Sequence, residues 1–179
     1  YKHSVLYYGP LAEKQLLATI DKNHATAKKL KDVPAGKAYT KQLTPQNEIW
    51  IAPYDAKNIY MIQYHNENQK WTPEDEAKIQ VFNEYFGGGM NGVVFQELRE
   101  SRGLAYSAFA DFSTPVRKAD SNYAYTYIIS QNDKMMDCIK VFSNILDTLP
   151  QSPAAFELAK QATMKRIASQ RITKTGIIY

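Results

Sequence analysis

The sequence of 179 residues has one cysteine, three histidines and no long apolar run. Cys138 has no second cysteine to form an internal disulfide, which leaves reducing and oxidising compartments equally open. A structural zinc site cannot be built from thiolates, and His3, His24 and His65 lack further ligands at zinc-site spacing, so we expect no metal site. The apolar runs are far shorter than the ~20 residues of a membrane helix, and we expect no membrane partner.

Motifs of two other functional classes are also missing. No Gly-x-Ser-x-Gly elbow is present for Ser-His-Asp catalysis. Gly87, Gly89 and Gly92 have the spacing G-x-G-x-x-G, but a helix is predicted before them, where a dinucleotide site needs a strand. We instead expect Gly87, Gly88, Gly89 and Gly92 to form a flexible, uncluttered loop that another backbone can approach closely.

The charge balance is mildly basic, with 22 Lys or Arg against 18 Asp or Glu. The net charge of +4 permits nucleic-acid contact without arguing for it. The lysines from Lys28 to Lys41 lie in a stretch without apolar periodicity, which indicates a solvated loop; a basic binding strip is the alternative. We expect no nucleic-acid partner.

The hydrophobic fraction of 44% is sufficient for a core, and the length suits one domain. We therefore expect residues 1–179 to form a single α+β domain. Residue 1 is tyrosine rather than methionine, so we also expect this domain to be an incomplete fragment of a longer polypeptide.

Strand and helix patterns alternate along the chain. Strands are predicted at His3–Tyr8, Glu48–Ala52, Ile59–Tyr64, Leu104–Phe112 and Asn122–Ile129. Helices are predicted at 10–20, 72–86, 91–102, 135–149 and 152–172, with Thr72-Pro73 as a start signal and Gly103 and Pro150 as stops. Paired strands separated by helices predict a mostly antiparallel sheet covered by helices on one face, an α+β fold.

Tyrosines recur on one face of the last predicted strand. Tyr123, Tyr125, Tyr127 and Ile129 alternate with other residues and therefore share a face. This alternation fits core packing beneath the helices, and it also fits a wall on which a peptide stacks.

An arginine and a tyrosine flank the predicted turn at Gly103. The turn can bring Arg99, late in a helix, and Tyr106, early in a strand, to the same edge of the fold. A guanidinium and a phenol are rigid donors suited to a peptide carbonyl or a developing oxyanion. The pattern alone favours an ordinary surface ion pair of Arg99 and core packing of Tyr106.

Three neighbouring segments resemble a known family. They are Phe86-Gly87-Gly88-Gly89-Met90-Asn91-Gly92, Phe95-Gln96-Glu97-Leu98-Arg99-Glu100 and Arg102-Gly103-Leu104-Ala105-Tyr106-Ser107. Together they resemble the second, zinc-free domain of the insulinase/pitrilysin family of zinc peptidases, to which mitochondrial processing peptidase belongs. The resemblance implies the α+β fold of those peptidase domains.

The resemblance also implies roles for two residues. In that family one domain binds zinc through H-x-x-E-H and a later Glu, and the opposing domain contributes an Arg and a Tyr seven positions apart. Arg99 and Tyr106 match this pair. Tyr106 would donate to the scissile carbonyl as it becomes an oxyanion, and Arg99 would hold the substrate backbone. Arg102 is a neighbouring candidate, but its distance from Tyr106 in the sequence does not match the pair.

The chain departs from an active peptidase because H-x-x-E-H is absent. We therefore expect it to be inactive alone, with zinc in a homologous partner domain on the same polypeptide or a separate subunit, and a peptide as substrate. The alternative is a structural or binding subunit of a peptidase-like assembly, which the presence or absence of H-x-x-E-H in the partner would decide. A periplasmic setting suits the family, although other members are cytosolic or mitochondrial.

Overall fold

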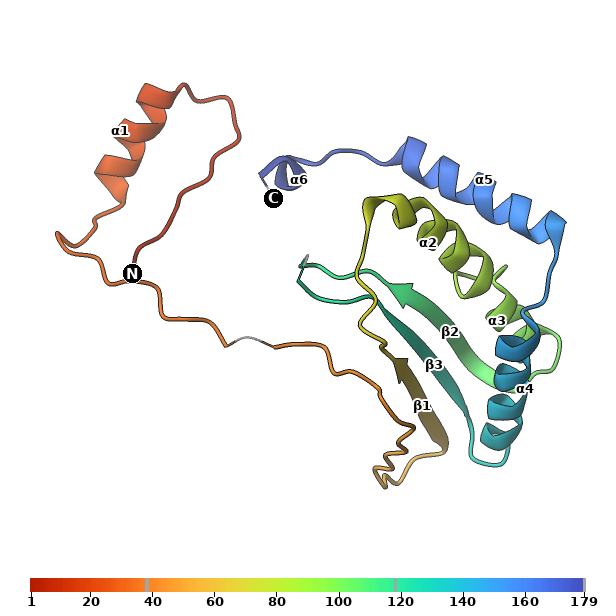
Figure 1. Ribbon diagram of the computed structural model, residues 1–179. Helices are drawn as coiled ribbons and strands as arrows, with labels where there is room; N and C mark the ends of the chain where they lie inside the picture. The colour runs from red at the N-terminus through yellow and green to blue at the C-terminus, as the bar shows by residue number, and fades with distance from the viewer. Residues whose placement is uncertain (38, 118, 179) are drawn as a thin grey trace. The chain divides into compact units, whose positions relative to one another are not determined.

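The computed structural model describes residues 1–37, 39–117 and 119–178, and the chain divides into two compact units. One unit comprises Tyr1–Tyr39 and Gln170–Tyr179, and the other comprises Thr40–Ser169. The first unit contains α1 (Glu13–Asn23) and α6 (Lys174–Ile178) (Figure 1). The expectation of a single domain over residues 1–179 stays a prediction.

The predicted strand His3–Tyr8 is wrong, because this segment forms no strand. Its apolar side chains are largely exposed, with Val5 at 57% and Leu6 at 63%. A strand needs a neighbour for its backbone hydrogen bonds, and the described part of this unit contains no other strand. The segment instead contacts the residue that follows α1, because the Nε2 atoms of His3 and His24 lie 2.8 Å apart.

The larger unit is built on a three-stranded antiparallel sheet. Its strands are β1 (Asn58–His65), β2 (Ala105–Ser113) and β3 (Tyr123–Gln131), in the order β1-β3-β2 (Figure 1). These three predicted strands are confirmed. The predicted strand Glu48–Ala52 is wrong: it is irregular, and its residues Ile49, Trp50 and Ile51 are more than four-fifths exposed, since no described strand pairs with them.

Helices follow the sequence pattern with small differences at their ends. They are α2 (Pro73–Phe86), α3 (Val93–Phe95), the π-helical turn η1 (Gln96–Glu100), α4 (Met135–Thr148) and α5 (Pro153–Ser169), which packs against α2. Thr72 precedes α2 as predicted, and its hydroxyl donates to the Asp75 carboxylate at 3.0 Å. Within the described ranges, no helix combines the length and apolarity needed to cross a membrane.

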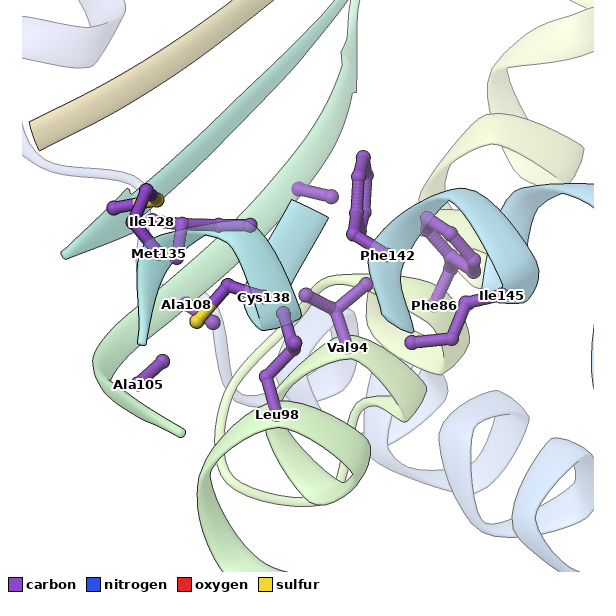
Figure 2. Close-up of a cluster of buried hydrophobic side chains, with 11 residues drawn as sticks. Phe86, Val94, Leu98, Ala105, Ala108, Ile128, Met135, Cys138, Phe142 and Ile145 are labelled. Carbon is purple, nitrogen blue, oxygen red and sulfur yellow. The ribbon is translucent and has the colours of Figure 1, made fainter. Parts of the chain in front are cut away.

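The core lies between one face of the sheet and the helices. Figure 2 shows its side chains converging from β2 and β3 on one side and from α2, α3, η1 and α4 on the other. They are Phe86, Val94, Leu98, Ala105, Ala108, Ala110, Ile128, Met135, Cys138, Phe142 and Ile145. The prediction of an antiparallel sheet covered by helices on one face is thereby confirmed.

The tyrosines of β3 lie on the opposite side of the sheet. Thr126, Ile128 and Ser130 face the helices and are buried, so core packing of the alternating tyrosines beneath the helices is wrong. The strand register places the following aromatic and aliphatic residues on this second side, and we call them the tyrosine face: Tyr60, Ile62, Tyr64, Phe109, Tyr123, Tyr125, Tyr127 and Ile129.

The glycine cluster lies where α2 meets β2. A Cβ atom on Gly87 would lie 1.6 Å from the backbone oxygen of Ala110, so only glycine fits there. The side chain of Asn83 fastens the same edge, because it donates to the Phe112 oxygen at 3.0 Å and accepts from the Phe112 N–H at 2.8 Å. The predicted close approach of another backbone is thus confirmed at Gly87, whereas the flexibility of the loop stays a prediction.

Candidate functional site

The helix that carries Arg99 ends in a widened turn. The Ser101 N–H donates to the Gln96 oxygen at 2.8 Å, a hydrogen bond across five residues that is typical of a π-helix. The sequence predicted a regular α-helix for this segment. Gly103 then adopts a φ of 57°, the left-handed conformation that favours glycine at a helix end. Its N–H donates to the Arg99 oxygen at 3.0 Å, which fixes the exit of the chain toward β2.

Tyr106 occupies a β-bulge at the start of β2. Ala105 pairs with Ser130 and Ser107 pairs with Ile129, so Tyr106 is the extra residue between two consecutive pairs. Its side chain is 74% exposed. A bulge re-aims a side chain away from the regular alternation of the strand, and bulges are frequent beside active sites.

The structure brings the two predicted site residues together. The guanidinium carbon of Arg99 lies 5.9 Å from the centroid of the Tyr106 ring and 5.0 Å from that of Phe95. The Arg99 Nε also lies 3.8 Å from an Oε1 of Glu100, a loose pair between half-exposed side chains. Arg102 is engaged elsewhere, because it donates to Glu97 at 3.2 Å.

Two residues that the sequence pattern did not single out hold the turn between Arg99 and Tyr106. The buried hydroxyl of Ser130 donates to the Leu104 oxygen at 2.5 Å, and the Lys134 ammonium donates to the Gly103 oxygen at 3.3 Å. The sequence contained a signal for Ser130, because this polar residue follows Ile128 by two positions and so lies on the same buried face of β3. A polar group in such a position requires a hydrogen-bond partner.

Phe95 belongs to the motif quoted above, but no role at the site was predicted for it, although its spacing was informative. It precedes Arg99 by four residues, the separation at which side chains on a helix are neighbours. Its ring provides a face for the guanidinium, and such a cation–aromatic contact restrains the arginine without neutralising its charge.

This arrangement supplies hydrogen-bond donors and no metal ligands. The Arg99 guanidinium and the Tyr106 hydroxyl both suit a peptide carbonyl or an oxyanion. Across the described ranges, no group of three or more His, Cys, Asp or Glu side chains could hold a metal ion. The residues in these ranges therefore do not fit a catalytic zinc.

A cavity in the larger unit is separate from this pair. It has a volume of about 350 Å³ and lies between the sheet and the helices α2 and α4. Phe82, Phe86, Phe142 and Leu146 line one side, and His65 lies among its lining residues. Neither Arg99 nor Tyr106 lines it, so its shape has no part in the site described above.

Residues 4–163 match the family model described as the peptidase M16 inactive domain. The sequence is 31% identical over 76 residues to an uncharacterised zinc protease of Mycobacterium tuberculosis strain H37Rv, covering 42% of this chain and 17% of that protein. An uncharacterised zinc protease of Mycobacterium leprae is 29% identical over 93 residues, covering 51% of this chain and 20% of the relative. The chain therefore spans a fifth or less of these relatives.

Two solved structures share the fold. The peptidase M16 inactive domain from Pseudomonas fluorescens aligns with a TM-score of 0.54 at 17% identity, covering 65% of this chain and 28% of that chain. The periplasmic protease PqqL from Escherichia coli aligns with a TM-score of 0.54 at 12% identity, covering 95% of this chain and 19% of that chain. At these identities the likeness is one of fold.

Proposed function

This chain belongs to the M16 peptidase family as an inactive domain, and we propose that it completes the active site of a zinc-bearing domain by contributing Arg99 and Tyr106. The partner domain lies on the same polypeptide or on a separate subunit. The reaction is hydrolysis of a peptide, in which this chain supplies binding and polarisation of the substrate.

The observation that carries the proposal is the contact between Arg99 and Tyr106. Their side chains converge although seven positions separate them, because η1, Gly103 and the bulge at Tyr106 each redirect the chain. Both remain accessible, with Tyr106 at 74% exposure and the Arg99 side chain at 47%. Two accessible donors that lie side by side are suited to a substrate that arrives from outside the domain.

Each of the two residues has a separate task in this proposal. The Tyr106 hydroxyl donates a hydrogen bond to the scissile carbonyl oxygen, which gains negative charge as the tetrahedral intermediate forms. The Arg99 guanidinium donates to a neighbouring carbonyl of the substrate backbone. The zinc and the general base belong to the partner domain, which is consistent with the poor fit of this chain's residues to a metal.

Arg99 and Arg102 provide a matched comparison that tests the proposal. Their side chains are 47% and 50% exposed, three positions apart, but only Arg99 contacts Tyr106. We expect Arg99→Ala in the intact protein to lower kcat/KM for a fluorogenic peptide by about 100-fold. Arg102→Ala should remain within about twofold of the wild type, because it removes only an exposed ion pair.

Two outcomes would contradict the proposal. Equal losses of kcat/KM in Arg99→Ala and Arg102→Ala would show that Arg99 has no specific role in the reaction. Wild-type hydrolysis by Arg99→Ala would favour the alternative function, in which the chain is a structural or binding subunit without a catalytic role. Zinc content, measured on each preparation, should be unchanged because neither arginine belongs to a metal site.

A periplasmic location is part of the proposal. Its support is the similarity of fold to PqqL, which is a periplasmic protease of Escherichia coli. Cell fractionation with antibodies against the intact protein tests it, and recovery in the cytoplasmic fraction alone would refute it.

A further inference from the structure

We propose that the segment Glu48–Ala52 closes onto the free edge of β1 as a fourth strand, and that this strand guards the edge against pairing with other chains. We call the segment the strap. The inference goes beyond the proposed function, and neither Arg99 nor Tyr106 has a part in it. The strap, β1 and their connection all belong to the unit Thr40–Ser169, so the inference concerns one compact unit.

The edge of β1 that faces away from β3 is open to pairing. In the order β1-β3-β2, β1 ends the sheet, and within the described ranges no strand pairs with its outer side (Figure 1). The outer N–H and C=O groups of an edge strand can pair with another extended chain, which makes such an edge a site of aggregation unless the protein covers it. Because β1 runs over eight residues, Asn58–His65, this edge offers several such groups.

The strap already has the two-residue alternation of a strand. The Nε2 of Gln46 donates to the Glu48 carboxylate at 2.9 Å, and the Nε1 of Trp50 donates to the same carboxylate at 3.1 Å. These three alternate side chains therefore share one side of the backbone, as they do along an extended chain. Between and after them lie Ile49 and Ile51, which are 88% and 83% exposed. The strap is thus extended and apolar, and it lacks only a partner for its backbone.

A pair of hydrogen bonds fixes the register that the strap takes when it closes. The Thr44 N–H donates to the Asn66 oxygen at 3.0 Å, and the Asn66 N–H donates to the Thr44 hydroxyl at 2.8 Å. Asn66 directly follows β1, so Thr44 already lies opposite the end of this strand. Antiparallel counting from this pair places Ala52 opposite Asn58. The five residues 53–57 then form a hairpin loop of a common length.

The same register matches the two sides of the strap to the two sides of the sheet. It places Trp50 opposite Tyr60 on the tyrosine face, where paired aromatic rings stabilise neighbouring strands. It places Ile49 opposite Met61, which packs against the core on the side that the helices cover. A register shifted by one residue would reverse both sides. The hydrogen bonds at Thr44 and the side-chain pattern therefore select the same pairing independently.

Cysteine pairs in the intact protein test the closed register. Glu48→Cys with Ile62→Cys places two thiols directly opposite each other, at a separation that a disulfide spans. Asn47→Cys with Ile62→Cys is the control, because the closed strap puts these two thiols on opposite sides of the sheet. We expect the first pair to oxidise at least about 10-fold faster than the control, and equal rates would overturn the inference. The native Cys138 is buried and does not compete.

Hydrogen exchange, followed by NMR, tests the pairing without a crosslink. Counting by twos from Asn66, the closed strap bonds the outward amides of Tyr60 and Ile62. We expect these amides in the wild type to exchange at least about 10-fold more slowly than free peptide amides. Glu48→Pro removes the N–H that faces Ile62 and should speed exchange at both positions, whereas Asn47→Pro removes an N–H that points to solvent. Unprotected wild-type amides, or equal effects of the two prolines, overturn the inference.

Self-association tests the guarding role of the strap. In light scattering we expect the apparent mass of Glu48→Pro to rise with protein concentration, because this variant exposes the edge of β1. The apparent mass of Asn47→Pro should stay at the wild-type value. Equal apparent masses of the two variants at every concentration would refute the guarding role. The proposed function is decided separately, by the turnover of Tyr106→Phe, which leaves the strap unchanged.

Discussion

The guanidinium carbon of Arg99 lies 5.9 Å from the centroid of the Tyr106 ring. Arg99 lies in a π-helical turn and Tyr106 occupies a β-bulge, so the contact joins two irregular pieces of backbone. The Phe95 ring, 5.0 Å from the same carbon, further restrains the guanidinium. The arginine and the tyrosine therefore form one structural unit.

Because the two side chains form a unit, their substitutions should not be additive. We expect Arg99→Ala combined with Tyr106→Phe to lose less activity than the product of the two single losses, with a coupling of about 1–2 kcal/mol. A double-mutant cycle on kcat/KM measures this coupling. Pairing Arg102→Ala with Tyr106→Phe provides the control, for which the losses should multiply, since Arg102 bonds Glu97 instead.

Gly87 should tolerate no side chain. A Cβ atom there would lie 1.6 Å from the Ala110 oxygen, so Gly87→Ala must push the end of α2 away from β2. We expect a loss of about 3 kcal/mol in the free energy of unfolding, measured by denaturant titration. Gly36→Ala is the matched control, because nothing lies within 4 Å of its new Cβ atom. Equal stability of the two variants would contradict the observed packing.

Ser130 should affect both stability and activity. Its hydroxyl donates to the Leu104 oxygen at 2.5 Å, between the turn at Gly103 and the bulge at Tyr106. Ser130→Ala leaves that oxygen without its donor, which should cost about 1–3 kcal/mol in unfolding free energy. The hydroxyl of Ser169 bonds within its own exposed helix end, so Ser169→Ala should be neutral.

The activity readout separates positioning from general stability in Ser130→Ala. We expect a lower kcat at a temperature at which the variant is fully folded, with partial recovery in Ser130→Thr, which restores a hydroxyl. Wild-type kcat in folded Ser130→Ala would show that this hydrogen bond does not position Tyr106.

The pH dependence of stability should include a contribution from Glu76. Hydrogen bonds from Gln80 and then from Trp71 hold the pKa of the Glu76 carboxyl below its ordinary value of 4.5. A lowered folded-state pKa stabilises the protein above pH 4.5, and this stabilisation is lost as pH falls through the folded-state pKa. Glu76→Gln should therefore flatten the acid limb of the unfolding free energy.

Trp71 provides a direct reporter for the same carboxyl. Its Nε1 donates to Glu76 at 2.9 Å, and the sequence contains only two tryptophans. In a Trp50→Phe background, Trp71 fluorescence should titrate below pH 4.5 in the folded protein. Persistence of that titration in Glu76→Gln would contradict the assignment.

Local signals predicted the elements on which the site depends. Thr72 and Pro73 mark the start of α2, and Gly103 marks the end of the Arg99 helix with a φ of 57°. Their conformational preferences are local, so a single sequence reveals them. The turn at Gly103 indicated that Arg99 and Tyr106 can reach the same edge of the fold, and their roles at a site stay predictions.

Features that depend on distant partners were not predictable from local pattern. His3–Tyr8 and Glu48–Ala52 have strand composition, but neither of them pairs with a strand in the described part of the chain. The bulge at Tyr106 depends on register with β3, which only the paired strands reveal. The alternation of residues along β3 showed that Tyr125 and Tyr127 lie on the same face of the strand. It did not show which of the two faces the helices cover.

The turnover of Tyr106→Phe in the intact protein, with zinc measured on the same preparation, tests most directly whether this chain contributes a donor to the reaction. This change keeps the aromatic ring beside Arg99 and removes only the hydroxyl. We expect a fall in kcat of about 100- to 1,000-fold, with KM and zinc content close to those of the wild type. A wild-type kcat at full zinc content would contradict it.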